Sequence, residues 1–346
     1  MMIKDNMFGY THDGKEVRLY RMQDGDFSVS VLSLGGIIQS LVVPDRLGRQ
    51  VDVVLGFDHV ADYEKQNCYI GATIGRCANR MRTENIVLND KKVFLAKNDK
   101  GYCHLHGGIS GFNQKIWQAT VLKDRLVLKY TSPDGEEGYP GTLCASITYQ
   151  LKDGVLTLHY QAETDQDTLC SLTNHSYFNL AGHQSGSVGL QSIQLAAHAY
   201  TPIEEHGLPT GNIELLNETP LFLQKERFFS ELWNTPFSQI EMAGGLDHNY
   251  LIDGTGLRWV ARAWSEKTGV TLDVQTDMPG LQLYSGNYLD HTLPKGKGGV
   301  EYEKRCGFCI ETQYPPDAIH FANFPQPILR CGETYDHITA FQFGIK

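Results

Sequence analysis

The sequence has no long hydrophobic run and no apolar leader. None of its apolar stretches approaches the ~18 residues or more that a membrane-spanning helix requires. The first residues, Met1 to Thr11, are polar and lack the ~7–15-residue apolar core of a secretion signal. We therefore predict a protein that has no membrane partner and is not exported.

Positive charge is also scarce. Lysine and arginine together number 30, against 40 aspartates and glutamates, which gives a formal net charge of −10. The basic residues form no cluster or stripe, and a negatively charged protein repels the phosphates of a nucleic acid. We therefore predict that nucleic acid is not a partner.

The cysteines lack the regular spacing of a disulfide framework. Without an export signal, such cysteines indicate free thiols and a cytoplasmic protein. Cys306 and Cys309 have the CxxC spacing of redox motifs, but no βαβ pattern surrounds them, and we interpret the spacing as incidental. The eight cysteines are Cys68, Cys77, Cys103, Cys144, Cys170, Cys306, Cys309 and Cys331.

Helical periodicity is rare, and alternation of apolar and polar residues dominates the chain. Short helices are expected only at 60–66 and 228–233. Strands are predicted at 121–130, 143–151, 155–163, 270–274 and 280–284.

Two hairpins are predicted from their turn residues. Asp153-Gly154 joins two of the predicted strands, and both residues tolerate the positive φ angles of a type I′ turn. Asn89-Asp90 is expected to join 86–88 to 93–95 in the same way. The 35 glycines and 13 prolines recur at short intervals, which is typical of many short strands. These patterns predict one large all-β domain over residues 1–346, with a two-domain chain as the alternative.

A carboxylate stands inside an otherwise apolar strand near the C-terminus. On an extended strand, Cys309, Glu311 and Gln313 share one face, whereas Phe308 and Ile310 lie on the other. Burial of a carboxylate costs several kcal/mol unless it is compensated. Glu311 is therefore a candidate general base, and a structural ion pair or a solvent-facing strand end is the alternative.

Histidines supply the other candidate groups. His175 lies among polar and aromatic residues, and an imidazole that titrates near neutrality can give a proton and recover it. A hydrogen-bonded structural histidine is the alternative. His104 and His106 stand at i and i+2, which on a strand places both side chains on one side as a workable metal-ligand pair. Cys103 would face away from both, and we do not predict a metal site.

Six short strings occur in one order along most of the chain. Taken together, they resemble the aldose 1-epimerase (galactose mutarotase) family. The strings are GRCANR at 75–80, LHGG at 105–108, NHSYFNL at 174–180, GLDH at 245–248, QLYSGN at 282–287 and IETQ at 310–313.

The resemblance implies a galactose-mutarotase-like β-supersandwich of antiparallel sheets, an aldose substrate and no cofactor. It implies that Glu311 is the base and His175 the acid. It further implies that Arg80, His106 and Asp247 orient the sugar, and that Asn79, Tyr177 and Gln282 line the site. Cys77, Met81 and Pro315 depart from the family's usual residues, which concerns fine substrate preference. The oligomeric state is left open between monomer and homodimer.

The chemistry of ring opening requires one acid and one base at the same carbon. We expect Glu311 to take the proton of the O1 hydroxyl while His175 protonates the ring oxygen. Three alternatives stay open at this point. A glycosidase would pair Asp247 with Glu311, a sugar-binding module would bind without catalysis, and an isomerase of another kind would depend on a metal.

Overall fold

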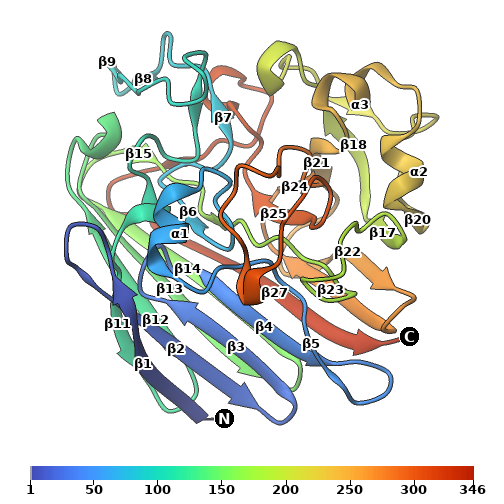
Figure 1. The fold of residues 1–346 in the computed structure, drawn as a ribbon. Coiled ribbons are helices and arrows are strands. Elements are labelled where there is room, and N and C mark those ends of the chain that lie inside the picture. The colour runs from blue at the N-terminus through green and yellow to red at the C-terminus, as the bar shows by residue number, and fades with distance from the viewer. Residues whose placement is uncertain (1) are drawn as a thin grey trace.

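A computed structural model describes residues 2–346, which form mainly antiparallel strands (Figure 1). The largest sheet has nine strands, and the C-terminal strand β27 lies in its middle, between β14 and β23. In spatial order the strands are β11 (Gln118–Val121), β12 (Leu126–Ser132), β13 (Leu143–Lys152), β14 (Val155–Thr164), β27 (Thr334–Ile345), β23 (Val270–Thr276), β22 (Arg258–Ser265), β17 (Gln191–Leu195) and β20 (Arg227–Phe228).

Two five-stranded sheets accompany the large one. The N-terminal sheet packs on its face, where β13 contacts β2 and β3 (Figure 1). It runs in chain order through β1 (Met2–Tyr10), β2 (Glu16–Asp24), β3 (Phe27–Leu32), β4 (Ile38–Pro44) and β5 (Gln50–Asp52). The other sheet has the order β19 (Glu214–Leu215), β18 (Ala197–Thr201), β21 (Asp247–Ile252), β24 (Gly280–Tyr284) and β25 (Cys309–Gln313).

Apolar side chains from these sheets fill one buried cluster. Val29 and Val31 of β3 belong to it together with Ile147 of β13 and Phe341 of β27. Because successive residues of a strand face opposite sides, the alternation seen in the sequence places one face of each sheet in this core. The prediction of an all-β chain with antiparallel sheets is confirmed.

Short two-stranded pairs carry several of the candidate site residues. Arg80 pairs with Leu105 between β7 and β10, and β16 ends one residue before His175. The pairs are β6 (Thr73–Ile74) with β16 (Thr173–Asn174), β7 (Arg80–Met81) with β10 (His104–Leu105), β8 (Val87–Leu88) with β9 (Lys91–Lys92), and β15 (Thr168–Leu169) with β26 (Ile328–Leu329).

Helices are few and short. The predicted helices at 60–66 and 228–233 are confirmed to within one residue as α1 (Val60–Lys65) and α2 (Phe229–Trp233). A third, α3 (Ser238–Ala243), was not predicted; it buries Ile240 and Ala243 and ends at Gly244 in the left-handed conformation. Among residues 2–346, no helix has the length and apolar composition needed to cross a bilayer.

The predicted turns form, but one of the predicted strands does not. Asp153 and Gly154 have φ angles of 51° and 77°, as a type I′ turn requires. Asn89 and Asp90 also have positive φ angles, of 49° and 62°. However, this turn pairs β8 with β9, the residues directly beside it, and the predicted strand at 93–95 is wrong. Val93 still donates its N–H to the Ile86 carbonyl at 3.0 Å. Val93 and Leu95 bury their side chains in a separate apolar cluster, whereas Phe94 is exposed.

Candidate active site

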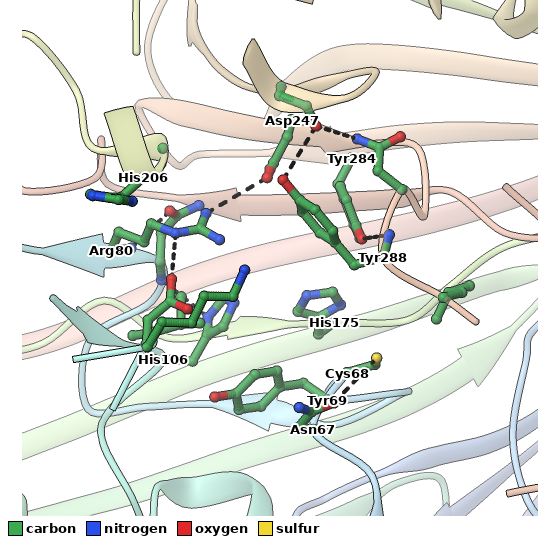
Figure 2. A pocket seen from close by; sticks show the side chains of 18 of the residues that line it. Asn67, Cys68, Tyr69, Arg80, His106, His175, His206, Asp247, Tyr284 and Tyr288 are labelled. Carbon is green, nitrogen blue, oxygen red and sulfur yellow. Dashed lines mark hydrogen bonds and ion pairs between the residues drawn. The ribbon is translucent and has the colours of Figure 1, made fainter. Parts of the chain in front are cut away.

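A cavity of about 630 Å³ opens beside the ends of β7, β10, β21, β24 and β25. Figure 2 shows His175, His106, Arg80, Asp247 and Tyr69 arranged around it. Seven of the eight residues predicted for the site line this cavity: Asn79, Arg80, His106, His175, Tyr177, Asp247 and Glu311. The eighth, Gln282, lies behind them.

Glu311 projects into the cavity from β25. Its strand neighbours Ile310 and Thr312 face the opposite way, Ile310 into the main core and Thr312 toward Thr339 at 2.5 Å. The carboxyl group is only 2% exposed, and within residues 2–346 its Oε2 atom has no hydrogen-bond partner. Burial, assisted by the charge of Asp247, raises the pKa of Glu311 well above its ordinary value. The carboxylate is therefore a stronger base than an ordinary glutamate side chain.

His175 is held rigidly on the opposite side of the same space. Its backbone N–H donates to the Ala72 carbonyl at 2.8 Å, and its carbonyl accepts the Gly71 N–H at 3.0 Å. The imidazole stacks nearly parallel with two tyrosine rings, whose centroids lie 6.0 Å (Tyr69) and 5.0 Å (Tyr177) from its own. This burial lowers the pKa of His175 to about 4.

The two groups face each other. The Nε2 atom of His175 lies 3.7 Å from Oε1 of Glu311. Because they are this close and both buried, they titrate as a pair. The raised pKa of Glu311 and the lowered pKa of His175 place a single added proton on the carboxyl group when the cavity is empty.

His106 presents a fixed hydrogen-bond donor. β10 ends one residue before His106, whose φ angle is 51°, and the His106 side chain lines the cavity. The backbone N–H of Asn79 donates to Nδ1 of His106 at 3.1 Å, and the Asn79 carbonyl accepts the His106 N–H at 3.1 Å. Burial lowers the pKa of His106 well below its ordinary value, so the ring is neutral. Since Nδ1 accepts, the proton of the neutral ring is on Nε2.

The hydrogen bond from the Asn79 N–H to His106 also determines how well the site would hold a metal. The ligand atoms of His106, His175 and Glu311 all lie within 4.8 Å of one another, close enough for one ion. A metal-bound histidine usually donates its other ring N–H to an acceptor. The other ring nitrogen of His106 instead faces the N–H of Asn79, which forces the proton onto the nitrogen that would bind the metal. The residues present do not fit a metal centre.

The expected pairing of His104 with His106 on one strand face is wrong. β10 ends at Leu105, and the backbone turns before the second histidine. His104 is fully buried elsewhere, where its Nε2 lies 2.7 Å from the Tyr139 hydroxyl and its Nδ1 lies 2.9 Å from the Ala96 carbonyl. His104 is a structural residue.

Charged and amide groups form a connected chain along another wall. Nε of Arg80 donates to Asp99 at 2.9 Å, and Nη1 of Arg80 lies 3.6 Å from Asp247. Gln282 donates from Nε2 to Asp247 at 2.6 Å. Arg80 and Asp247 thus offer a donor and an acceptor to hydroxyl groups, while Gln282 orients the acceptor and does not itself line the cavity.

Sequence reasoning missed several lining residues. Tyr69, Asp99 and Tyr284 all border the cavity. Tyr284 lies inside the string QLYSGN and could have been noticed there. Tyr69 and Asp99 lie in loops whose local sequence gives no indication of where they meet the site.

Aromatic and basic side chains form the rim of the cavity. The rings of Tyr102 and His206 stack with centroids 3.5 Å apart, and Lys100 Nζ lies 5.8 Å from the centre of the Tyr288 ring. Three separate segments of the chain therefore lie close together at the cavity.

Comparison with known proteins shows the family of the chain. The aldose 1-epimerase family model matches residues 18–342. Galactose mutarotase from Bos taurus is 41% identical over 330 residues, which cover 95% of this chain and 94% of that protein. Aldose 1-epimerase from Escherichia coli (strain K12) is 32% identical over 338 residues, 96% of each chain.

Solved structures show the same architecture. An aldose epimerase homologue from C. elegans superposes with a TM-score of 0.87 at 27% identity, over 94% of this chain and 98% of that chain. Galactose 1-epimerase from Lactobacillus acidophilus NCFM gives a TM-score of 0.85 at 26% identity, over 99% of both. The galactose-mutarotase-like fold predicted from the sequence is confirmed. The chain belongs to the aldose 1-epimerase family.

Proposed function

We propose that this protein is an isomerase that interconverts the α and β anomers of free aldoses such as galactose and glucose. One observation carries the proposal: a buried carboxylate and a buried imidazole lie 3.7 Å apart at the wall of a cavity that also offers hydrogen-bond donors and acceptors. The family to which the chain belongs and the names of its relatives support the same activity.

Ring opening moves one proton to the base and one from the acid. The Glu311 carboxylate takes the proton of the O1 hydroxyl, and protonated His175 gives the proton on Nε2 to the ring oxygen. The bond between C1 and the ring oxygen breaks as the C1–O1 double bond forms. Rotation about C1–C2 then presents the other face of the aldehyde.

Reclosure reverses both transfers. The protonated Glu311 returns a proton to O1, and the neutral His175 takes the proton of the newly formed hydroxyl as the ring oxygen attacks C1. No proton is gained or lost over the cycle, and no covalent intermediate is needed. Each positioned group contributes about 10²–10⁴ in rate.

Substrate binding prepares the pair for this exchange. In the empty cavity the shared proton lies on Glu311, whereas ring opening requires it on His175. Sugar hydroxyls that donate to the Glu311 carboxylate favour its ionised form. The proton then passes across the short gap to Nε2 of His175.

Other groups hold the sugar and stabilise charge. The Nε2–H of His106 and the guanidinium of Arg80 donate to oxygens that become negative during opening. Asp247 accepts from sugar hydroxyls, and Asn79 and Tyr177 complete the wall. Gln282 acts through Asp247.

Polarimetry tests the proposal directly. The protein should accelerate the drift in optical rotation of freshly dissolved α-galactose or α-glucose, and it should release no nitrophenol from an aryl glycoside. The opposite pattern would indicate a glycosidase that uses Asp247 and Glu311. Binding of galactose without any acceleration would indicate a sugar-binding module.

Three further features stay predictions. The cavity is lined by residues between Asn67 and Glu311, which is consistent with residues 1–346 acting as one domain. The cytoplasmic location stays an expectation from the sequence. A monomer and a homodimer are both compatible with the proposed chemistry.

A further inference from the structure

Cys309 lies directly behind the proposed acid. It is the first residue of β25, two positions before Glu311 and on the same strand face, and it is fully buried. Its Sγ atom lies 3.4 Å from Nδ1 of His175, and Cys309 is not among the residues that line the cavity. The nitrogen that faces Glu311 is Nε2.

The reaction dictates which nitrogen of His175 keeps a proton throughout. Nε2 must give a proton during opening and take it back during closure. When Nε2 is unprotonated the neutral ring must therefore carry its hydrogen on Nδ1. This permanent N–H needs an acceptor behind the ring, a place that a buried carboxylate occupies in serine-protease triads.

We propose that Cys309 is a positioning residue: its neutral sulfur accepts the permanent Nδ1–H of His175 and so keeps Nε2 turned toward Glu311 and the ring oxygen of the sugar. This inference rests on the function proposed above. It assigns opposite tautomers to two of the histidines that line the cavity, Nδ1–H for His175 and Nε2–H for His106.

A thiol suits this position better than a carboxylate. Burial raises the pKa of the Cys309 thiol well above its ordinary value, so the group stays uncharged. A carboxylate at the same place would stabilise the imidazolium and make it a weaker acid. Sulfur is a weak acceptor, which orients the ring with little effect on its acidity. The rings of Tyr69 and Tyr177 stack against the imidazole and add to its packing.

Nitrogen NMR of the imidazole rings tests the assignment without relying on activity. Protein labelled with ¹⁵N-histidine shows which ring nitrogen carries the proton, and the His175→Asn variant identifies the signals of His175. The substrate-free wild-type protein should show Nδ1–H for His175. In Cys309→Ala the signals should become an average of both tautomers, and Cys309→Ser should restore the wild-type pattern because a hydroxyl oxygen also accepts.

Activity provides the second readout. Cys309→Ala should lower kcat about threefold to tenfold, the range of one neutral hydrogen bond, with KM changed less than about twofold. Cys306→Ala is the matched control, since Cys306 is another buried thiol of the same apolar cluster. It should leave both kcat and the tautomer unchanged.

Two results would overturn the inference: an Nε2–H tautomer in the wild-type protein, or an unchanged spectrum and kcat in Cys309→Ala. The proposed function fails separately, through absence of mutarotation by the wild-type protein. In that case the NMR result still decides which ring nitrogen carries the proton.

Discussion

Nε2 of His175 and Oε1 of Glu311 lie 3.7 Å apart, and the two residues are 5% and 2% exposed. Burial moves their pKa values in opposite directions, up for the carboxyl group and down for the imidazole. The pKa of a glutamate is ordinarily lower than that of a histidine, and here this order is reversed. A pair of this kind holds one proton in total between the two pKa values. Ring opening keeps that total, because His175 gives one proton to the ring oxygen while Glu311 takes another from O1.

The pH dependence of kcat/KM should reflect this reversal. Activity requires one proton on the pair, so it falls at low pH when a second proton binds and at high pH when the first is lost. The lowered pKa of His175, about 4, places the acid limb near that value. The raised pKa of Glu311 places the alkaline limb well above the range of an ordinary carboxyl group. Polarimetric rates, with circular dichroism to check folding at each pH, measure both limbs; an acid limb near ~6.5, the ordinary value for histidine, would contradict the reversal.

Chelators should have no effect on activity. The Asn79 N–H holds the proton of His106 on Nε2, which prevents that nitrogen from binding a metal. Incubation with EDTA followed by polarimetry should give the untreated rate, and added zinc or manganese should not increase it. Loss of activity with EDTA and recovery with either metal would show instead that the site uses an ion.

Weakening the hydrogen bond between Asp99 and Arg80 should affect substrate binding more than the turnover rate. Asp99 accepts from Nε of Arg80 at 2.9 Å, and Asp99→Asn removes the charge while keeping the size of the side chain. We expect KM to rise about threefold to tenfold, with a smaller change in kcat. This is less than the loss of a whole charge-assisted hydrogen bond, because the amide oxygen of the replacement can still accept from Nε of Arg80. Steady-state polarimetry measures both constants. Glu266→Gln, at an exposed carboxylate, is the control; an unchanged KM in Asp99→Asn would show that Asp99 does not position Arg80.

Much of this architecture follows from local sequence patterns. Period-two alternation predicts the long strands, and Asp153-Gly154 predicts its turn, because side-chain direction and turn geometry are local properties. Glu311 is noticeable for the same reason, as a carboxylate between apolar strand neighbours. The family strings then indicate which isolated candidates belong together.

What the sequence does not predict depends on contacts between distant segments. The side chains of His104 and His106 point to different places because the backbone turns at His106 with a positive φ angle. The neighbouring residues do not predict that angle. Asp99 and Tyr69 reach the cavity only after separate loops have packed. The contact between Cys309 and His175 joins residues 134 positions apart. Strand alternation places Cys309 and Glu311 on the same face of β25. It does not predict which residue packs against Cys309.

Gly107 should be intolerant of any side chain. Its φ angle is 86°, and a Cβ atom there would lie 1.8 Å from the Gly75 carbonyl oxygen. Gly107→Ala must displace backbone, and we expect a loss of several kcal/mol in the free energy of unfolding, on the order of the largest single-residue effects. Thermal or urea denaturation measures the loss.

Gly332 provides the matched control. It has a similar φ angle of 87°, but no atom lies within 4 Å of the position of an added Cβ. Gly332→Ala therefore adds only backbone strain, about 1 kcal/mol. Equal destabilisation by the two substitutions would show that the close approach to Gly75 is not what requires glycine at Gly107.

The most direct test of the acid–base pair is the mutarotation rate of fresh α-galactose with Glu311→Gln, measured by polarimetry beside the wild-type protein and His175→Asn. Both variants should fold normally by circular dichroism. Each should lose about 10²–10⁴ in kcat, because one of the two proton transfers loses its partner. Near-normal mutarotation by a folded Glu311→Gln protein would contradict the assignment of Glu311 as the base.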